Sequence, residues 1–119
     1  MKIEISNVKG VSIAEVISDK IVINETQDAL DIMAESGYLG STKIIVHEHN
    51  IIPSFFDLKT GIAGDILQKF STYNVQLAIV GKFAKYTSKS LNDFIYESNK
   101  YGRIIFVSSL SEAIERLAK

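Results

Sequence analysis

The residues of this chain that could do chemistry are concentrated between positions 47 and 64. His47 and His49 are the only histidines, and in an extended segment they would point to the same side and could share a metal ion. Glu48 or Asp57 could then supply an oxygen ligand. A metal site needs a further ligand that the sequence does not indicate, so the alternative is a polar strand end that enters a loop. We therefore predict no metal and no cofactor, and keep His47 and His49 only as candidate ligands.

A second set of residues lies at the start of an amphipathic segment. Thr60 precedes it, where a hydroxyl can accept a hydrogen bond from a free amide of the first helical turn. Gly61 and Gly64 leave the start of the helix uncovered, and a glycine inside a helix costs about 1 kcal/mol relative to alanine. Either the glycines let the helix pack tightly on the sheet, or they serve a phosphorylation switch, an anion site or a contact. We take Asp57, Lys59, Thr60, Gly61 and Gly64 as the candidate regulatory or binding residues.

Patterns typical of catalytic sites are missing. Ser54, His49 and Asp57 could form a nucleophilic triad on paper, but no Gly-x-Ser-x-Gly turn is present to expose the serine. The sequence also lacks the phosphate-binding Gly-x-x-x-x-Gly-Lys-Ser/Thr pattern and the dinucleotide-binding Gly-x-Gly-x-x-Gly pattern. We therefore predict no catalytic residues and lean toward a protein that is not an enzyme.

Composition narrows the class of protein. The 119 residues include 13 basic and 14 acidic side chains, so the net charge of −1 creates no overall attraction to nucleic acid or membrane. Absence of cysteine removes disulfides and thiolate chemistry. No stretch approaches the roughly 18 apolar residues of a membrane span, and the N-terminus has no apolar signal core. We expect a cytoplasmic protein that binds neither nucleic acid nor membrane.

The spacing of apolar residues predicts an α/β fold with the order β-β-α-β-α-β-α-β-α. Strands are predicted at residues 2–8, 11–17, 43–46, 75–80 and 103–107, and helices at residues 26–36, 61–73, 91–101 and 110–117. The first two strands form a hairpin that could extend toward residues 21–23. Because each later strand is followed by a helix, the rest of the sheet should be parallel. We expect one domain over residues 1–119.

Turn and capping residues separate these elements. Residues 9–10 end in a glycine that can adopt the positive φ of a tight hairpin turn. Gly37 and Gly102 stand where a glycine commonly ends a helix. Ser109 and Glu112 have the spacing of a capping box, in which serine and glutamate satisfy each other's free backbone amides.

The carboxyl ends of the parallel strands are the place where open α/β sheets bind ligands. The polar or small residues expected there are His47, His49, Gly81, Lys82, Ser108 and Ser109. They favour an alternative function, in which the chain is a small-ligand or metal-binding protein and possibly an enzyme.

Apolar side chains and unpaired backbone could also contact another chain. Phe55 and Phe56 follow Pro53 in a loop, where they either fill the end of the core or form an exposed patch, and we expect at least one in the core. The opening hairpin could leave a strand edge unpaired, which would favour a homodimer.

Two family resemblances cover these residues. The stretch 43–63 (KIIVHEHNIIPSFFDLKTGIA) resembles STAS domains, the anti-sigma-factor antagonists, in which a buried strand leads to an Asp-Ser-Ser-Gly loop with a phosphorylatable hydroxyl before the second helix. Thr60 matches that phosphoacceptor, although the spacing differs by one residue and Lys59 replaces a small hydroxyl residue. The stretches 27–31 (QDALD), 55–70 (FFDLKTGIAGDILQKF) and 94–99 (FIYESN) resemble a small bacterial family catalogued as domain of unknown function 4180.

These observations favour a non-enzymatic regulatory or protein-interaction module. The STAS resemblance implies a STAS-like fold and a protein partner. The resemblance to the domain of unknown function implies no activity. We therefore expect a contact surface at residues 57–64.

Overall fold

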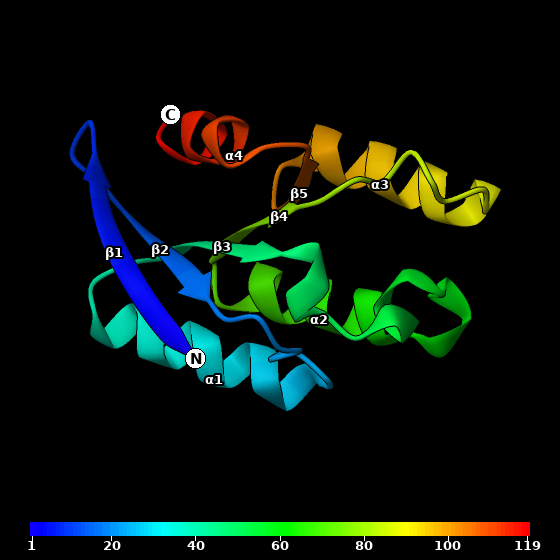
Figure 1. The fold of residues 1–119 in the computed structure, drawn as a ribbon, viewed down its shortest axis with the longest axis horizontal. Coiled ribbons are helices and arrows are strands. Elements are labelled where there is room, and N and C mark those ends of the chain that lie inside the picture. Colours follow the sequence, from blue (N-terminus) through cyan, green and yellow to red (C-terminus); the bar gives the residue numbers. More distant parts are fainter.

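A computed structural model describes residues 1–119 and contains five strands, four α-helices and three short 3₁₀ turns (Figure 1). The strands are β1 (Lys2–Val8), β2 (Val11–Ile17), β3 (Lys43–His47), β4 (Gln76–Val80) and β5 (Ile104–Val107). The α-helices are α1 (Thr26–Tyr38), α2 (Ile62–Thr72), α3 (Lys89–Tyr101) and α4 (Leu110–Leu117). The 3₁₀ turns Glu48–Asn50, Pro53–Phe56 and Leu58–Thr60 all lie between β3 and α2. The predicted order of elements is confirmed.

The five strands form one sheet in the order β1-β2-β3-β4-β5. β1 pairs antiparallel with β2, and the remaining neighbours are parallel. Lys9 and Gly10 have φ values of 53° and 81°, as a two-residue hairpin turn of type I′ requires. The predicted N-terminal hairpin and mostly parallel sheet are therefore confirmed.

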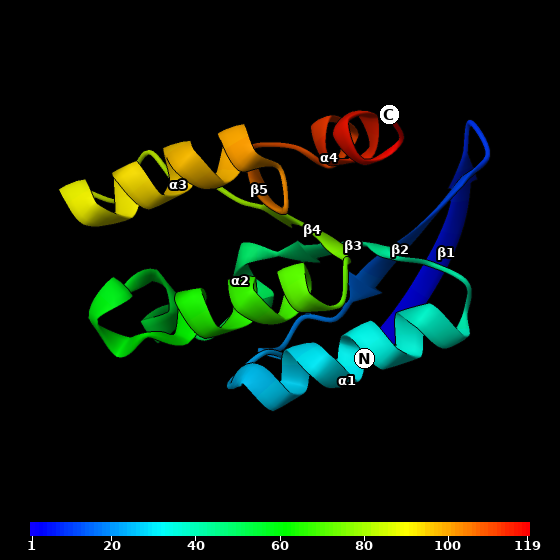
Figure 2. The same ribbon diagram turned by 180° about the vertical axis from the view of Figure 1, so that it is seen from behind.

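Helices cover both faces of the sheet, as Figures 1 and 2 show from opposite sides. α1 and α2 pack on one face through Ile32, Met33, Ile66 and Phe70, and α4 packs on the other through Ala113 and Leu117. α3 runs along the edge strand β5. There Asn99 accepts a hydrogen bond of 2.7 Å from the Phe106 amide and donates one of 3.2 Å to its carbonyl, which pairs the outer edge of the strand at this residue.

Two predicted boundaries are wrong. Gly37 does not end the first helix, because α1 continues to Tyr38 and the chain turns only at Gly40, whose φ is 93°. The hairpin does not extend through residues 21–23, because β2 ends at Ile17 and Ile23 forms only an isolated bridge with Ile51.

The predicted caps are largely present. Gly102 follows α3 with a φ of 91°. Ser109 accepts a hydrogen bond of 3.1 Å from the Glu112 amide, but the Glu112 carboxylate accepts from the Ser108 amide rather than from Ser109. The serine half of the capping box is thus confirmed, and the return bond is shifted by one residue. None of the helices has the length and apolar character needed to cross a bilayer.

Candidate functional site

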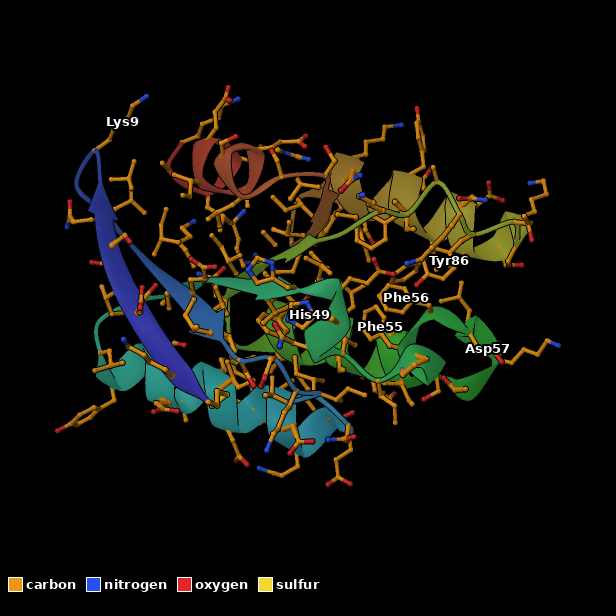
Figure 3. The ribbon with its side chains drawn as sticks, in the orientation of Figure 1. Lys9, His49, Phe55, Phe56, Asp57 and Tyr86 are labelled. Atoms are coloured by element: carbon orange, nitrogen blue, oxygen red, sulfur yellow. The ribbon has the colours of Figure 1, made fainter.

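The segment between β3 and α2 is anchored by two aromatic side chains. Phe55 and Phe56 are only 1% and 7% exposed, and their rings meet edge to face with centroids 4.9 Å apart. Phe56 also stacks on Tyr86 at 5.1 Å. Figure 3 shows these rings directed inward, with Asp57 at the outer edge of the loop. The expectation that at least one phenylalanine fills the core is confirmed. The two buried rings anchor the loop that follows to the core.

Thr60 ties this loop together through its hydroxyl group. The hydroxyl oxygen lies 2.8 Å from the Ser54 carbonyl oxygen and 2.9 Å from that of Asp57, and it shares its proton between them. It accepts a longer hydrogen bond of 3.3 Å from the Ile62 amide, the first residue of α2. The expected bond from a first-turn amide is therefore present. Thr60 is exposed, so this turn is accessible from solvent.

The two glycines of the segment have different structural roles. Gly61 precedes α2 with a φ of 78°. This is a left-handed backbone conformation that residues other than glycine rarely adopt. Gly64 lies inside α2 with ordinary helical geometry and is exposed, and a Cβ atom there would meet nothing within 4 Å. The interpretation that Gly64 lets the helix pack tightly on the sheet is therefore wrong, because no neighbour approaches it.

Gly64 instead borders a groove between α2 and α3. The groove has a volume of about 550 Å³ and is lined by Gly64, Leu67, Gln68, Ser71, Phe94, Glu97, Ser98 and Tyr101. Each helix contributes four residues at the spacing i, i+3, i+4 and i+7, which is one helical face. Sequence reasoning missed the groove, because the spacing identifies each face but not that the two faces lie side by side.

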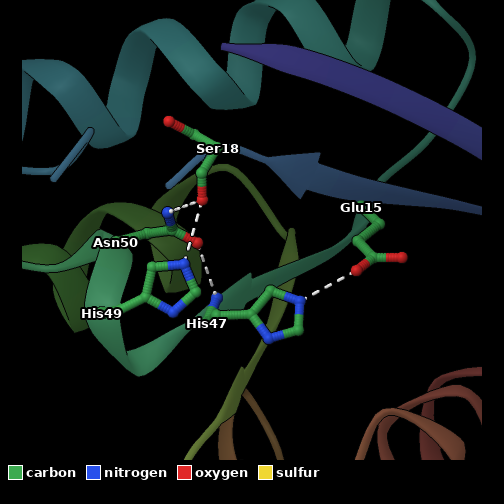
Figure 4. Close-up of polar contacts among 5 residues, drawn as sticks. All are labelled: Glu15, Ser18, His47, His49 and Asn50. Carbon is green, nitrogen blue, oxygen red and sulfur yellow. Dashed lines mark hydrogen bonds and ion pairs between the residues drawn. The ribbon is translucent and has the colours of Figure 1, made fainter. Parts of the chain in front are cut away.

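The two histidines have separate hydrogen-bond partners (Figure 4). His47 Nε2 lies 2.8 Å from Glu15 Oε2, and His49 Nε2 lies 2.9 Å from the Ser18 carbonyl oxygen. Their ring centroids are 5.7 Å apart, but the chain is not extended here because a 3₁₀ turn begins at Glu48. No group of three His, Cys, Asp or Glu side chains is close enough to hold a metal ion.

The side chains of Ser54, His49 and Asp57 do not form a triad. His49 bonds to the Ser18 carbonyl, and Ser54 contributes only its backbone carbonyl to Thr60. The Asp57 carboxylate accepts a hydrogen bond of 3.2 Å from the Lys59 amide. No hydrogen bond joins the three side chains, so the arrangement does not activate a serine.

Glu48 connects the carboxyl end of β3 to the loop after β4. One carboxylate oxygen accepts hydrogen bonds of 2.5 Å from the Tyr86 hydroxyl and 2.9 Å from Lys85 Nζ, and the other accepts one of 3.1 Å from the Lys82 amide. Burial alone would raise the pKa of Glu48, but the donated hydrogen bonds and the charge of Lys85 outweigh it and hold the pKa below its ordinary 4.5. Burial raises the pKa of Tyr86 well above its ordinary 10.0, and the hydrogen bond and charge of Glu48 raise it further.

The predicted ligand site at the strand ends is only partly assembled. Gly81, Lys82 and Ser108 line one cavity of about 540 Å³ beyond β4 and β5. His49 lies instead in a separate groove with Glu48 and Tyr86, and Ser109 caps α4. The six residues proposed for this alternative therefore do not converge on one site.

The Glu48–Tyr86 pair predicts a specific dependence of stability on pH. A lowered carboxyl pKa stabilises the folded state above the ordinary value of 4.5, and this contribution is lost as the pH falls through the folded pKa. A raised phenol pKa stabilises it below the ordinary value of 10.0, and this contribution is lost as the pH rises above that value. We expect Tyr86→Phe to lower the free energy of unfolding by about 1.5 kcal/mol at pH 7 and to weaken the decline above pH 10.

Urea unfolding at pH 3, 7 and 11 would measure both effects. Tyr38→Phe is the matched control, because Tyr38 is 90% exposed and has no hydrogen-bond partner in the structure. If the free energy of unfolding fell equally between pH 7 and pH 11 in wild type and Tyr86→Phe, Tyr86 would not be the source of the alkaline pH dependence.

Comparison with known proteins gives one family and one related structure. A family model described as domain of unknown function (DUF4180) matches residues 8–117. The structure is similar to the crystal structure of a candidate anti-sigma factor antagonist from Thermotoga maritima, with 17% sequence identity and a TM-score of 0.49 over 98% of this chain and 95% of that chain. A similarity of this size supports no inference about function. No curated protein is significantly similar in sequence.

Proposed function

This chain belongs to the family described as domain of unknown function (DUF4180), and we propose that it is a non-enzymatic regulatory module that binds another protein. The proposed contact surface comprises residues 57–64 and the adjoining groove between α2 and α3. Its polar part contains Asp57, Lys59, Thr60 and Gly61, all of them exposed.

Gly64 carries this proposal because it borders the groove, whereas Gly37, the other exposed helical glycine, lines no cavity. A glycine inside an exposed helix destabilises it by about 1 kcal/mol relative to alanine. Neither its backbone conformation nor a close neighbour requires glycine at this position. A partner that approaches the α2 backbone through the groove would require it, since any side chain would occupy that space.

The groove suits an amphipathic helix of the partner. Leu67 and Phe94 provide apolar walls, and Gly64, Ser71 and Ser98 contribute small side chains to its lining. An apolar centre beside a polar rim is the usual arrangement of a protein interface, and helices commonly bind in grooves of this kind. Tyr101 is 76% exposed at one end, where an aromatic ring can contribute strongly to binding.

Phosphorylation of Thr60 would provide the regulation. The hydroxyl proton now bonds to the carbonyl oxygens of Ser54 and Asp57, and a phosphate ester has no such proton. The added negative charge would also lie near the Asp57 carboxylate. Modification would therefore rearrange the polar part of the contact surface.

We expect Gly64→Arg to abolish partner binding, because the arginine side chain would fill the groove. Gly37→Arg is the matched control, since Gly37 is also an exposed helical glycine with nothing within 4 Å of a Cβ atom, but it lies in α1. In quantitative affinity capture from source cells, wild type and Gly37→Arg should each recover at least about ten times as much of the partner as Gly64→Arg does. A tenfold weaker affinity of Gly64→Arg corresponds to a loss of about 1.4 kcal/mol of binding free energy. Recovery of the same proteins by all three baits would refute the contact surface.

Dimerisation of the chain itself through the unpaired edge of β1 stays a separate prediction. Light scattering on purified protein tests it independently. A dimer that persists in Gly64→Arg would place the dimer contact outside the groove.

A further inference from the structure

A second cavity lies at the opposite end of the strands from residues 57–64. It has a volume of about 500 Å³, and its lining includes Thr42, Lys43, Asn74, Gln76, Tyr101 and Arg103. Most of these residues lie at the amino ends of β3, β4 and β5 or within two positions before them, and Tyr101 is the last residue of α3. No carboxylate lines the cavity. It is therefore both polar and positively charged.

Strand register places the two cationic residues on the same face of the sheet. Lys43 pairs with Gln76, and the pairing of Leu77 with Ile104 puts Arg103 beside Gln76. Because neighbouring strands are about 4.8 Å apart, the backbones of Lys43 and Arg103 are separated by about 10 Å. Gln76 lies between them on the middle strand, and both cationic residues line the cavity, which is large enough to hold a phosphate group.

The charges of both side chains are left without a counter-ion. Lys43 Nζ hydrogen-bonds to the Gln76 side-chain oxygen, and Arg103 Nη2 donates to Asn74 Oδ1 at 3.0 Å. Both acceptors are neutral amides, and neither cation takes part in an ion pair.

Arg103 also has a donor without a partner. Its Nε atom is buried and has no hydrogen-bond acceptor. Such donors are rare in folded proteins. An oxyanion in the cavity would supply the negative charge that the two cations lack.

We propose that this cavity binds a small phosphate-type oxyanion between Lys43 and Arg103. Guanidinium and ammonium groups together form charge-assisted hydrogen bonds to phosphate oxygens, and the exposed Thr42 hydroxyl is a further donor. The oxyanion is either inorganic phosphate or the phosphate group of a nucleoside monophosphate. In the second case the exposed Tyr101 ring offers a stacking surface for the base.

The test measures binding of inorganic phosphate and adenosine monophosphate by calorimetry and thermal unfolding, at constant ionic strength in sodium chloride. We expect saturable binding of one ligand per chain and an increase in Tm of about 3 °C at saturation. Arg103→Gln and Lys43→Gln should each weaken binding at least about tenfold. Lys20→Gln removes one exposed positive charge elsewhere and should bind as wild type does.

The outcomes separate the two sources of phosphate. Tighter binding of the nucleotide, lost in Tyr101→Ala, identifies a nucleotide site, and equal affinities identify a phosphate site. Circular dichroism checks that each variant is folded. If Arg103→Gln does not fold, Lys43→Gln provides the test of the cavity. Absence of saturable binding of either ligand, or unchanged binding in both variants of the cavity, overturns the proposal.

Discussion

Asn50→Ala should lower the free energy of unfolding by about 3 kcal/mol. Asn50 is fully buried. Its side-chain amide donates hydrogen bonds of 2.9 Å to the carbonyl oxygens of Ser18 and Lys20, and its side-chain oxygen accepts one of 3.1 Å from the His47 amide. Alanine would leave the Lys20 carbonyl and the His47 amide without these partners, whereas the Ser18 carbonyl keeps its bond from His49. Each buried unsatisfied group costs about 1–3 kcal/mol.

Urea unfolding of Asn50→Ala beside Asn7→Ala would measure this effect. Asn7 is exposed on β1 and its side chain forms no hydrogen bond, so its replacement should change stability by less than about 0.5 kcal/mol. The backbone of Asn50 also accepts from the Val22 and Ile23 amides, at 2.8 and 3.0 Å, and these bonds survive the substitution. A loss below about 1 kcal/mol would mean that water replaces the side chain.

The local periodicity of the sequence predicted most of the fold. Alternation in residues 2–17 predicted the hairpin, and the positive φ values of Lys9 and Gly10 explain why the turn occurs there. Helical spacing located all four helices to within a few residues. These features depend on neighbours in the chain, which a single sequence displays directly.

The contacts that define the candidate sites depend on residues far apart in the chain. Asn50 bonds to residues about thirty positions earlier, and Glu48 meets Tyr86 across 38 positions. Lys43 and Arg103 become neighbours only through the register of three strands. A sequence shows such residues as isolated polar positions, so their pairing could not be predicted from spacing.

Gly64 illustrates the same limit for a residue that the sequence did single out. The cost of glycine inside a helix indicated a packing or contact role, and the pattern left both tight packing on the sheet and an external contact open. The open space around a Cβ atom at this position eliminates packing. Gly81, which no pattern marked as tightly packed, is the glycine that has no room for a side chain.

Gly81→Ala should destabilise the protein by about 2 kcal/mol, because its new methyl group would overlap Glu48. A Cβ atom at this position would lie 2.6 Å from both Cβ and Oε1 of Glu48 and 3.0 Å from the Phe83 ring. The Gly81 backbone is fixed, since its amide donates a hydrogen bond of 3.0 Å to the Val107 carbonyl. Glu48 must therefore move away, which costs about 1–3 kcal/mol as overpacking and weakens its bond to Tyr86.

Two substitutions of the same chemical size provide the comparison for Gly81→Ala. Gly64→Ala and Gly37→Ala add a methyl group in open space inside a helix, so each should raise the free energy of unfolding by about 0.5–1 kcal/mol. Gly81→Ala should also lose the part of the alkaline pH dependence that Tyr86→Phe loses, because both changes disrupt the same hydrogen bond. If Gly81→Ala were as stable as wild type with an unchanged pH profile, Glu48 would have free space beside β4. Its burial and its short bond to Tyr86 would then not describe the protein in solution.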